Sequence, residues 1–286
     1  TIEEMAFYNN DNDALTSVTL PANLVSLGEY AFGDSAKLTT VYVNSGANGR
    51  QLEFAAGAFS GTSATRYSYV TTVYLGADVP LIDVAGIFGS TRLSNVIVDE
   101  NNQNYEDVEG VLYNRGVTEL IFYPSTRTGE YVLPETVTRI GNNAFAGKTG
   151  LTKITIGANV TEIGNSAFES CSGLQEVVFA ASSYASLTIG SYAFEDCTRL
   201  TTINLPEGLT SIGAMAFSST ALTSITLPST LASMGELKTD TSGSYYYLDV
   251  FDDCDNLTAV NVAEGNNYYT SIDGILYAKS VVDPDA

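Results

Sequence analysis

The chain has no histidine and no tryptophan, and it carries few positive charges. Its 286 residues include 12 Lys and Arg against 33 Asp and Glu, which gives a formal net charge of −21. Without His, the catalytic Ser–His and Cys–His pairs and the His-based metal sites are excluded. The shortage of Lys and Arg argues against nucleic acid as a partner, because phosphates are bound by positive side chains that release counterions.

Long apolar runs are also absent. No stretch approaches the roughly 18 to 20 apolar residues that are needed to span a bilayer, so we expect no direct membrane insertion. The chain begins at Thr1 inside a repeat, without a basic and apolar leader. We therefore expect any signal peptide or anchor to lie outside this sequence.

Cysteine is scarce, and its three copies share one position in a repeated pattern, Phe-x-x-Cys-x-x-Leu. They are Cys171, Cys197 and Cys254, and other repeats place Ser35 or Lys148 there. This spacing predicts core positions, where free Cys behaves as a small apolar residue. A disulfide between Cys171 and Cys197 in neighbouring turns stays open as an alternative, although the pattern does not require it. The redox compartment is left undetermined.

A leucine-based sequence pattern repeats along the chain. Leu15 and Leu38 are 23 residues apart, Leu151 and Leu174 are also 23 apart, and 26 residues separate Leu174 from Leu200. Within each repeat, apolar residues follow the leading Leu at the third and fifth positions after it. A fixed period between about 20 and 29 residues with this pattern is the signature of a leucine-rich repeat solenoid, in which stacking of turns creates the core.

Each repeat opens on an alternating segment such as residues 15–20, which is typical of a strand with one buried face. Val18 and Leu20 should point inward. Proline ends this strand because it has no amide hydrogen to donate, at Pro21, Pro134, Pro206 and Pro228. A second short apolar segment, such as residues 137–140, should form the opposite side. The glycine that follows is expected at a corner with unusual backbone angles, at Gly141, Gly164, Gly190 and Gly213. The next Ala-Phe pair should place its ring in the core.

The whole pattern, Leu-x-x-Ile-x-Leu-Pro-x-x-Leu-x-x-Ile-Gly-x-x-Ala-Phe-x-x-Cys, resembles the BspA-type leucine-rich repeat family of bacterial surface and secreted proteins. The Asn-x-x-Tyr…Gly-Val-Leu-Tyr insert at 102–113 and Ile121-Phe-Tyr-Pro124 add to the resemblance. It implies a β-rich, curved, right-handed solenoid with a concave parallel β-sheet, short strands and turns on the convex side, and little helix. By association it implies adhesion or recognition at the cell surface. It offers no catalytic residues to transfer.

We expect one leucine-rich repeat domain over residues 1–286, with about ten or more turns and with both ends inside a repeat. Residues 85–88 depart from the Ile-Gly-x-x-Ala-Phe pattern. Two long intervals, 38–70 and 222–257, leave room for extra loops, which often carry binding in solenoids. A third insertion occurs twice, at 96–113 and 260–277, and is predicted to form a small hairpin.

The outward position of each strand predicts a contact surface. Tyr42, Tyr74 and Ile97 should neighbour one another across strands, whereas Thr and Asn dominate this position elsewhere. Clustered exposed aromatic residues mark recognition sites, so these three are candidate binding residues. Simple cross-strand packing under an inserted loop is the alternative. Tyr245, Tyr246 and Tyr247 carry the same two interpretations, as a binding platform or as the anchor of their own loop.

Acidic clusters are candidate catalytic or metal sites. Glu106, Asp107 and Glu109, or Asp252, Asp253 and Asp255, supply the residue types of a glycosidase acid and base. Residues 9–13 and 252–255 offer oxygen ligands for Ca²⁺ but lack the spacing of an EF-hand. We favour solvated acidic loops in each case, and expect no catalytic residues, no metal and no cofactor.

The sequence therefore predicts a monomeric, non-catalytic recognition or adhesion module at the cell surface or secreted. It should bind an extracellular protein or a neutral glycan through its concave face or inserted loops. A glycan-acting enzyme that uses carboxylates, and a purely structural spacer, are the alternatives. The ligand itself stays unnamed, because solenoid surfaces vary freely on one scaffold.

Overall fold

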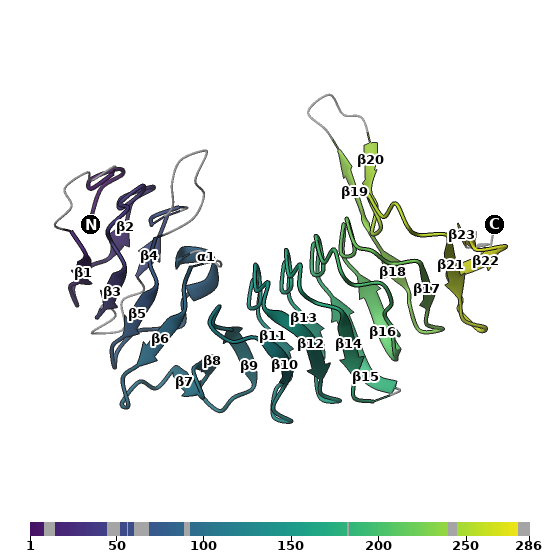
Figure 1. Ribbon diagram of the computed structural model, residues 1–286, viewed down its shortest axis with the longest axis horizontal. Coiled ribbons are helices and arrows are strands. Elements are labelled where there is room, and N and C mark those ends of the chain that lie inside the picture. The colour runs from purple at the N-terminus through teal and green to yellow at the C-terminus, as the bar shows by residue number, and fades with distance from the viewer. Residues whose placement is uncertain are drawn as a thin grey trace, which may run out of the picture. The chain divides into compact units, whose positions relative to one another are not determined.

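The computed structural model describes residues 1–8, 15–44, 52–55, 57–59, 69–88, 92–181, 183–239 and 245–279. The chain divides into two compact units, Thr1–Arg127 and Thr128–Ala286. Both are β-solenoids, and the described residues contain one short helix (Figure 1). The predicted β-rich repeat fold is confirmed, while the single-domain organisation stays a prediction.

In the first unit, one parallel sheet carries the leading segment of each repeat. Its strands, in spatial order, are β1 (Ser17–Leu20), β3 (Thr40–Val43), β5 (Thr72–Leu75) and β6 (Asn95–Val98). Val41 pairs with Val73, and Val73 pairs with Val96, so the buried positions of successive turns are aligned. All three are at most 4% exposed. Alternation in the sequence thus gives one face to the core and one to solvent.

Shorter elements complete the first unit. Strands β2 (Ser26–Leu27) and β4 (Glu53–Phe54) form a second parallel pair. The irregular segment at 85–88 lies in helix α1 (Val84–Phe88), which buries Phe88 completely. The first insertion is an antiparallel hairpin of β7 (Tyr105–Val108) and β8 (Val111–Asn114), and β9 (Glu119–Phe122) pairs with β8. The predicted hairpin is confirmed.

In the second unit, the leading segments form two parallel sheets. The first contains β10 (Gly129–Val132), β12 (Leu151–Ile156) and β14 (Glu176–Phe179), and the second contains β17 (Ser224–Leu227) and β21 (Ala259–Val262). The opposite side is a parallel row of β11 (Arg139–Ile140), β13 (Glu162–Ile163), β15 (Ser183–Ile189), β16 (Glu207–Ile212) and β18 (Ser233–Met234).

Two antiparallel hairpins extend the second unit. One joins β19 (Glu236–Thr239) to β20 (Tyr245–Leu248), within the interval that was predicted to hold an extra loop. The other joins β22 (Tyr269–Ile272) to β23 (Ile275–Ala278) and is the second copy of the predicted insertion hairpin.

Stacked phenylalanine rings run through both cores. Phe168 and Phe194 lie with ring centroids 5.0 Å apart and planes 2° from parallel, and Phe194 stacks on Phe217 at 5.3 Å. In the first unit, Phe32 stacks on Phe59 at 5.4 Å. The Ala-Phe pairs from Phe32 onward therefore place their rings in the core as predicted, whereas Phe7 is 44% exposed. Stacking of one ring per turn makes each turn depend on its neighbours for burial.

The cysteine position joins successive turns by hydrogen bonds. The side chains of Ser35, Cys171, Cys197 and Cys254 each donate to the backbone oxygen of the Phe in the preceding turn, at 2.9 to 3.3 Å. Cys171 and Cys197 are fully buried, as predicted, whereas Cys254 is partly exposed, and all three thiols are free. Burial raises the pKa of the Cys171 thiol to about 12.

The corner glycines correct one expectation. None of Gly141, Gly164, Gly190 and Gly213 has a positive φ. The left-handed conformation falls instead on the residue two positions later, at Asn143, Ser166, Tyr192 and Met215. Glycine is required for a different reason, because a Cβ on Gly190 would lie 2.7 Å from the backbone N of Asn165 in the preceding turn. Close approach of turns, and not backbone angle, selects glycine here.

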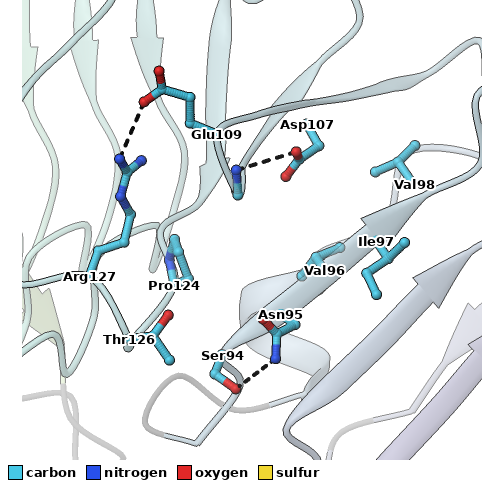
Figure 2. Close-up of a pocket in the computed structure, with 11 residues that line it drawn as sticks. Ser94, Asn95, Val96, Ile97, Val98, Asp107, Glu109, Pro124, Thr126 and Arg127 are labelled. Atoms are coloured by element: carbon cyan, nitrogen blue, oxygen red, sulfur yellow. Dashed lines mark hydrogen bonds and ion pairs between the residues drawn. The ribbon is translucent and has the colours of Figure 1, made fainter.

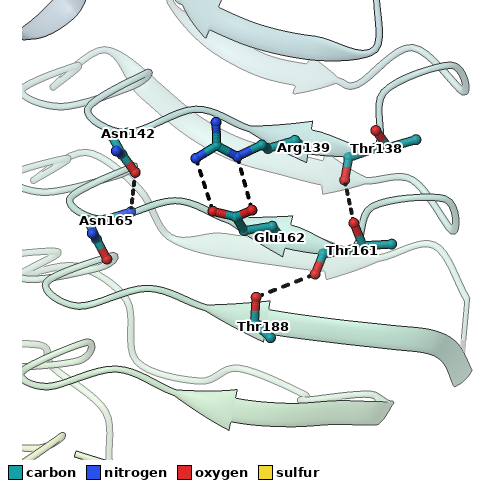
Figure 3. A network of polar contacts seen from close by, with 7 residues as sticks. All are labelled: Thr138, Arg139, Asn142, Thr161, Glu162, Asn165 and Thr188. Carbon is teal, nitrogen blue, oxygen red and sulfur yellow. Dashed lines mark hydrogen bonds and ion pairs between the residues drawn. The ribbon is translucent and has the colours of Figure 1, made fainter. Parts of the chain in front are cut away.

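Polar side chains continue the stacking on the surface of the second unit (Figure 3). The Asn142 Oδ1 accepts from the Asn165 N–H at 2.8 Å, and the Asn165 Oδ1 accepts from the Ser191 N–H at 2.9 Å. Beside them Arg139 and Glu162 form an ion pair at 3.0 Å. The asparagine contacts repeat from one turn to the next, which identifies them as part of the scaffold.

Candidate functional site

The solvent face of the first sheet carries the predicted aromatic cluster. Tyr42 pairs with Tyr74 across β3 and β5, and Tyr74 pairs with Ile97 across β5 and β6. The two tyrosine rings stack, with centroids 4.5 Å apart and planes 12° from parallel. Both rings are partly exposed, and Ile97 is 44% exposed. We call these three residues the tyrosine patch.

The patch differs from the same position in other turns. Thr19 precedes it on β1, and the corresponding residues of the second unit are Val132, which is 66% exposed, Thr155, Val178, Asn204, Thr226 and Asn261. A partly exposed, stacked aromatic pair thus occurs against a background of small and polar side chains. Stacked rings on a rigid strand face lose little conformational freedom on binding, which suits them to recognition.

A cavity of about 310 Å³ borders the patch at Ile97 (Figure 2). One side is formed by Ser94 and by β6 (Asn95–Val98), which is the end strand of its sheet. The other sides are the turn of the first insertion hairpin, residues 107–110, and the segment 124–127. We call this cavity the β6 pocket. Its volume lies at the lower end of the range for small-molecule sites, about 300 to 1,000 Å³.

Carboxylates stand across the β6 pocket from the strand. The Asp107 Oδ1 accepts from the Gly110 N–H at 3.3 Å and so holds the hairpin turn (Figure 2). The Glu109 carboxylate lies 3.4 Å from the Arg127 guanidinium, and the Glu109 side chain is 80% exposed. At such exposure the ion pair is weak. Both carboxylates therefore keep acceptor oxygens for a ligand.

The predicted acidic clusters are only partly brought together. Asp107 and Glu109 line one pocket, while Glu106 is directed to another contact, the Gly116 N–H at 3.4 Å. Asp252, Asp253 and Asp255 line neither of the two described cavities. In the described part of the chain, no group of three or more acidic or cysteine residues is placed to hold a metal ion. Residues 9–13 lie outside the described residues.

The second predicted contact, Tyr245 to Tyr247, lies in β20. Its backbone pairs antiparallel with β19, so that Tyr247 faces Leu237 in register and Tyr246 faces Lys238. The side chains of these tyrosines lie outside what the structure describes. Their binding role stays a prediction.

Sequence reasoning missed the residue that anchors each insertion hairpin. The Asn102 side chain is fully buried; its amide donates to the Gly76 oxygen at 2.7 Å, and its Oδ1 accepts from the Tyr105 N–H at 2.9 Å. Asn266 makes the equivalent contacts in the second copy. The signal was present, since Asn occupies the same place in both inserts. The β6 pocket beside the first hairpin was also missed.

A second cavity, of about 690 Å³, lies between β14 and residues 202–206 in the second unit. Here the ladder of leading strands is interrupted, because residues 202–205 pair with no described strand. Phe179 and Ala180 are among its lining residues, and no described tyrosine is. Its aromatic lining residue is Phe179, whereas the β6 pocket has no aromatic lining residue and adjoins the stacked tyrosine pair through Ile97.

The repeats match the model of a known protein family. The family model of the BspA type leucine rich repeat region matches residues 1–107 and 117–242 in six copies. The chain belongs to this family. The matched residues fall in both units and include the strands that carry the tyrosine patch, whereas residues 108–116, with the hairpin turn, and residues 243–286 lie outside the match. A search of curated protein sequences gives no match.

Solved structures agree on the fold of this BspA-type chain. The pneumococcal vaccine antigen PcpA is 24% identical with a TM-score of 0.65, over 92% of this chain and 60% of PcpA. A leucine-rich cell surface protein from Faecalibacterium prausnitzii A2-165 is 21% identical with a TM-score of 0.53, over 91% of this chain and 82% of that one. The chain thus spans about three fifths of the PcpA structure. No helix among the described residues is long and apolar enough to cross a membrane.

Proposed function

We propose that this BspA-type chain is a non-catalytic recognition or adhesion module, located at the cell surface or secreted, which binds an extracellular partner through the tyrosine patch. The observation that carries the proposal is the stacked, partly exposed Tyr42–Tyr74 pair on an otherwise small and polar sheet face. Family membership and the likeness in fold to a bacterial cell surface protein support it.

The net negative charge of the protein limits the classes of partner that it can bind. With 33 acidic against 12 basic residues, the chain repels polyanions at a distance, so nucleic acids and sulfated glycans are disfavoured. Neutral glycans and extracellular proteins with a neutral or basic contact surface remain. Aromatic side chains in the middle of an interface commonly carry most of its binding energy.

The test is a binding screen with matched variants. The purified chain is presented to immobilised extracellular matrix proteins and to an array of neutral glycans, and affinities are measured for the binders. We expect Tyr42→Ala/Tyr74→Ala to weaken binding about thirtyfold, which corresponds to about 2 kcal/mol. The melting temperature should be nearly unchanged, because both rings lie outside the core.

A matched control removes two other exposed tyrosines. Tyr268 and Tyr277 are 47% and 45% exposed and belong to the second unit, so Tyr268→Ala/Tyr277→Ala should leave the affinity unchanged. Equal losses in both double variants would show that aromatic content, and not the patch, governs binding. No binder in either panel would favour a spacer, and cleavage products from a bound glycan would favour the enzyme alternative.

A further inference from the structure

The two insertion hairpins have the same sequence pattern but meet their neighbouring strands differently. Residues 96–113 and 260–277 align without a gap, so β6 corresponds to β21 and the turn at Glu109–Gly110 corresponds to the turn at Asp273–Gly274. Both turns have positive φ at both residues. The copies therefore serve as controls for one another within a single chain.

In the second copy, the hairpin closes on the free edge of its strand. The Val260 N–H donates to the Gly274 oxygen at 2.8 Å, and the Val262 N–H donates to the Ser271 hydroxyl at 3.0 Å. A Cβ on Gly274 would lie 2.9 Å from the Ala259 Cβ, so turn and strand are in direct contact. The edge of β21 is thus satisfied by one carbonyl and one hydroxyl.

In the first copy, the hairpin stands away from the strand. A Cβ on Gly110 would meet nothing within 4 Å, and the β6 pocket lies between the turn and the strand (Figure 2). Val96 and Val98 correspond to Val260 and Val262, yet within the described residues no group accepts their N–H. Asn95 and Asp107 replace the Ala259 and Ser271 of the closed copy.

These replacements define the chemistry of a ligand. It must accept hydrogen bonds from the edge N–H groups of β6, as the Ser271 hydroxyl does in the closed copy. It must also donate to the Asp107 and Glu109 carboxylates on the other side. Hydroxyl groups do both, whereas an anionic ligand would be repelled by the carboxylates. A peptide strand paired with β6 presents one backbone N–H for every two residues on its far edge, whereas a sugar ring presents several hydroxyl donors to Asp107 and Glu109.

The neighbouring patch extends the site. Tyr42 stacks on one face of the Tyr74 ring, and Tyr74 pairs in register with Ile97 across β5 and β6. Strands of one sheet lie about 4.8 Å apart, so the path from Tyr74 over Ile97 into the pocket is about 10 Å long. A ligand of two or more linked rings spans this path.

We propose that the β6 pocket is a subsite for one sugar ring of a neutral glycan, whose adjoining sugar rests on Ile97 and Tyr74. This inference rests on the proposed function, since it names the ligand class of the same surface. Asn95 and the β6 edge donate to the sugar hydroxyls, and Asp107 and Glu109 accept from them. The second hairpin has no such subsite, because its own Ser271 and Gly274 occupy the edge.

Calorimetric titration with maltotetraose, cellotetraose and chitotetraose tests the subsite. Tetragalacturonate serves as the anionic control and a capped Val-Thr hexapeptide as the strand control. We expect at least one neutral tetrasaccharide to bind and neither control to bind. Asn95→Ala/Asp107→Ser, which installs the residues of the closed copy, should weaken sugar binding about tenfold or more. Glu109→Gln, at an exposed position, should weaken it without any risk to folding.

The outcomes separate the two proposals. If no tetrasaccharide binds while a protein partner still depends on Tyr42 and Tyr74, the glycan subsite is wrong and the proposed function stands. If a tetrasaccharide binds and is sensitive to Asn95 and Asp107 but not to the tyrosines, the subsite stands and the role of the patch is wrong. Hexapeptide binding that ignores the pocket variants would identify strand addition, and hydrolysis of the tetrasaccharide would identify an enzyme; either overturns the subsite.

Discussion

One position in each repeat determines how neighbouring turns are joined at the level of single side chains. At this position a small side chain donates a hydrogen bond to the equivalent Phe backbone oxygen of the preceding turn. A hydroxyl does so at Ser35, and a thiol does so at Cys171, Cys197 and Cys254. Lys148 occupies this position too and is 1% exposed. Because a long cationic side chain is buried where other repeats have a thiol or a hydroxyl, we expect its protonation to affect the free energy of unfolding.

Lys148 makes stability depend on pH. Burial lowers the pKa of its ammonium group to about 8, below the value near 10.5 of an exposed lysine. The unfolded chain therefore binds this proton more tightly, and raising the pH from 8 toward 10 favours folding. We expect the free energy of unfolding of the native protein, minus that of Lys148→Met, to rise by about 2 kcal/mol across this window. Urea melts at pH 7.5 and 9.5 measure it, and a constant difference would show that Lys148 is not desolvated.

The thiols should resist labelling in the folded protein. Burial raises the pKa of both the Cys171 and the Cys197 thiol, so the reactive thiolate does not form at neutral pH. Each residue is also 0% exposed, so a reagent cannot reach it in the folded protein. A maleimide reagent at pH 7.5 should modify these two only on the timescale of unfolding. Cys254, which is partly exposed, should react sooner. Fast modification of all three would contradict the assigned core position.

At the scale of elements, the stacked phenylalanines carry the packing between turns. Phe194 lies between Phe168 and Phe217 and is 0% exposed, so Phe194→Ala should lower the free energy of unfolding by about 3 to 5 kcal/mol. Phe7 stacks on Phe32 at 4.9 Å but is 44% exposed, and Phe7→Ala should cost less than about 1 kcal/mol. Denaturant melts of both variants measure these losses. Equal losses in the free energy of unfolding would contradict the claim that the buried phenylalanine stack carries the packing between turns.

The two insertion hairpins allow a second matched comparison. Val111 and Ile275 hold the same place after the turn, but Val111 is 0% exposed and Ile275 is 59% exposed. Val111→Thr buries a hydroxyl and should destabilise the protein by about 1 to 3 kcal/mol. Ile275→Thr should stay within about 0.5 kcal/mol of the native protein. If the second substitution is as costly as the first, Ile275 is buried in solution.

Strands and core rings that follow the repeated apolar pattern could be predicted from the sequence. Distances between neighbouring turns, or between a hairpin and a strand, could not. The alternation at 15–20 and the Ala-Phe pairs report burial directly, so their strands and rings lie where expected. The role of Gly164 was predicted wrongly, because a distance between turns, and not a local angle, selects it. The order Tyr42, Tyr74, Ile97 follows from register alone. The β6 pocket depends on how far a hairpin turn stands from a strand, which no local pattern encodes.

At the scale of the whole molecule, the proposed function assigns recognition to one part of a scaffold that otherwise repeats. The first unit carries the tyrosine patch and the β6 pocket, and the corresponding positions of the second unit hold Thr, Val and Asn. In a solenoid, each turn contacts only its neighbours, so surface residues change without disturbing the core. A binding site confined to three consecutive strands is consistent with that freedom.

The most direct measurement is a hydrogen-exchange footprint of the protein with the strongest binder from the protein and glycan panels. Our account predicts slower exchange on binding in residues 40–43, 72–75 and 95–98, with residues 107–110 added when the binder is a glycan. Exchange in residues 259–278 should be unchanged. Protection confined to residues 236–248, or to the second unit in general, would contradict the assignment of recognition to the tyrosine patch.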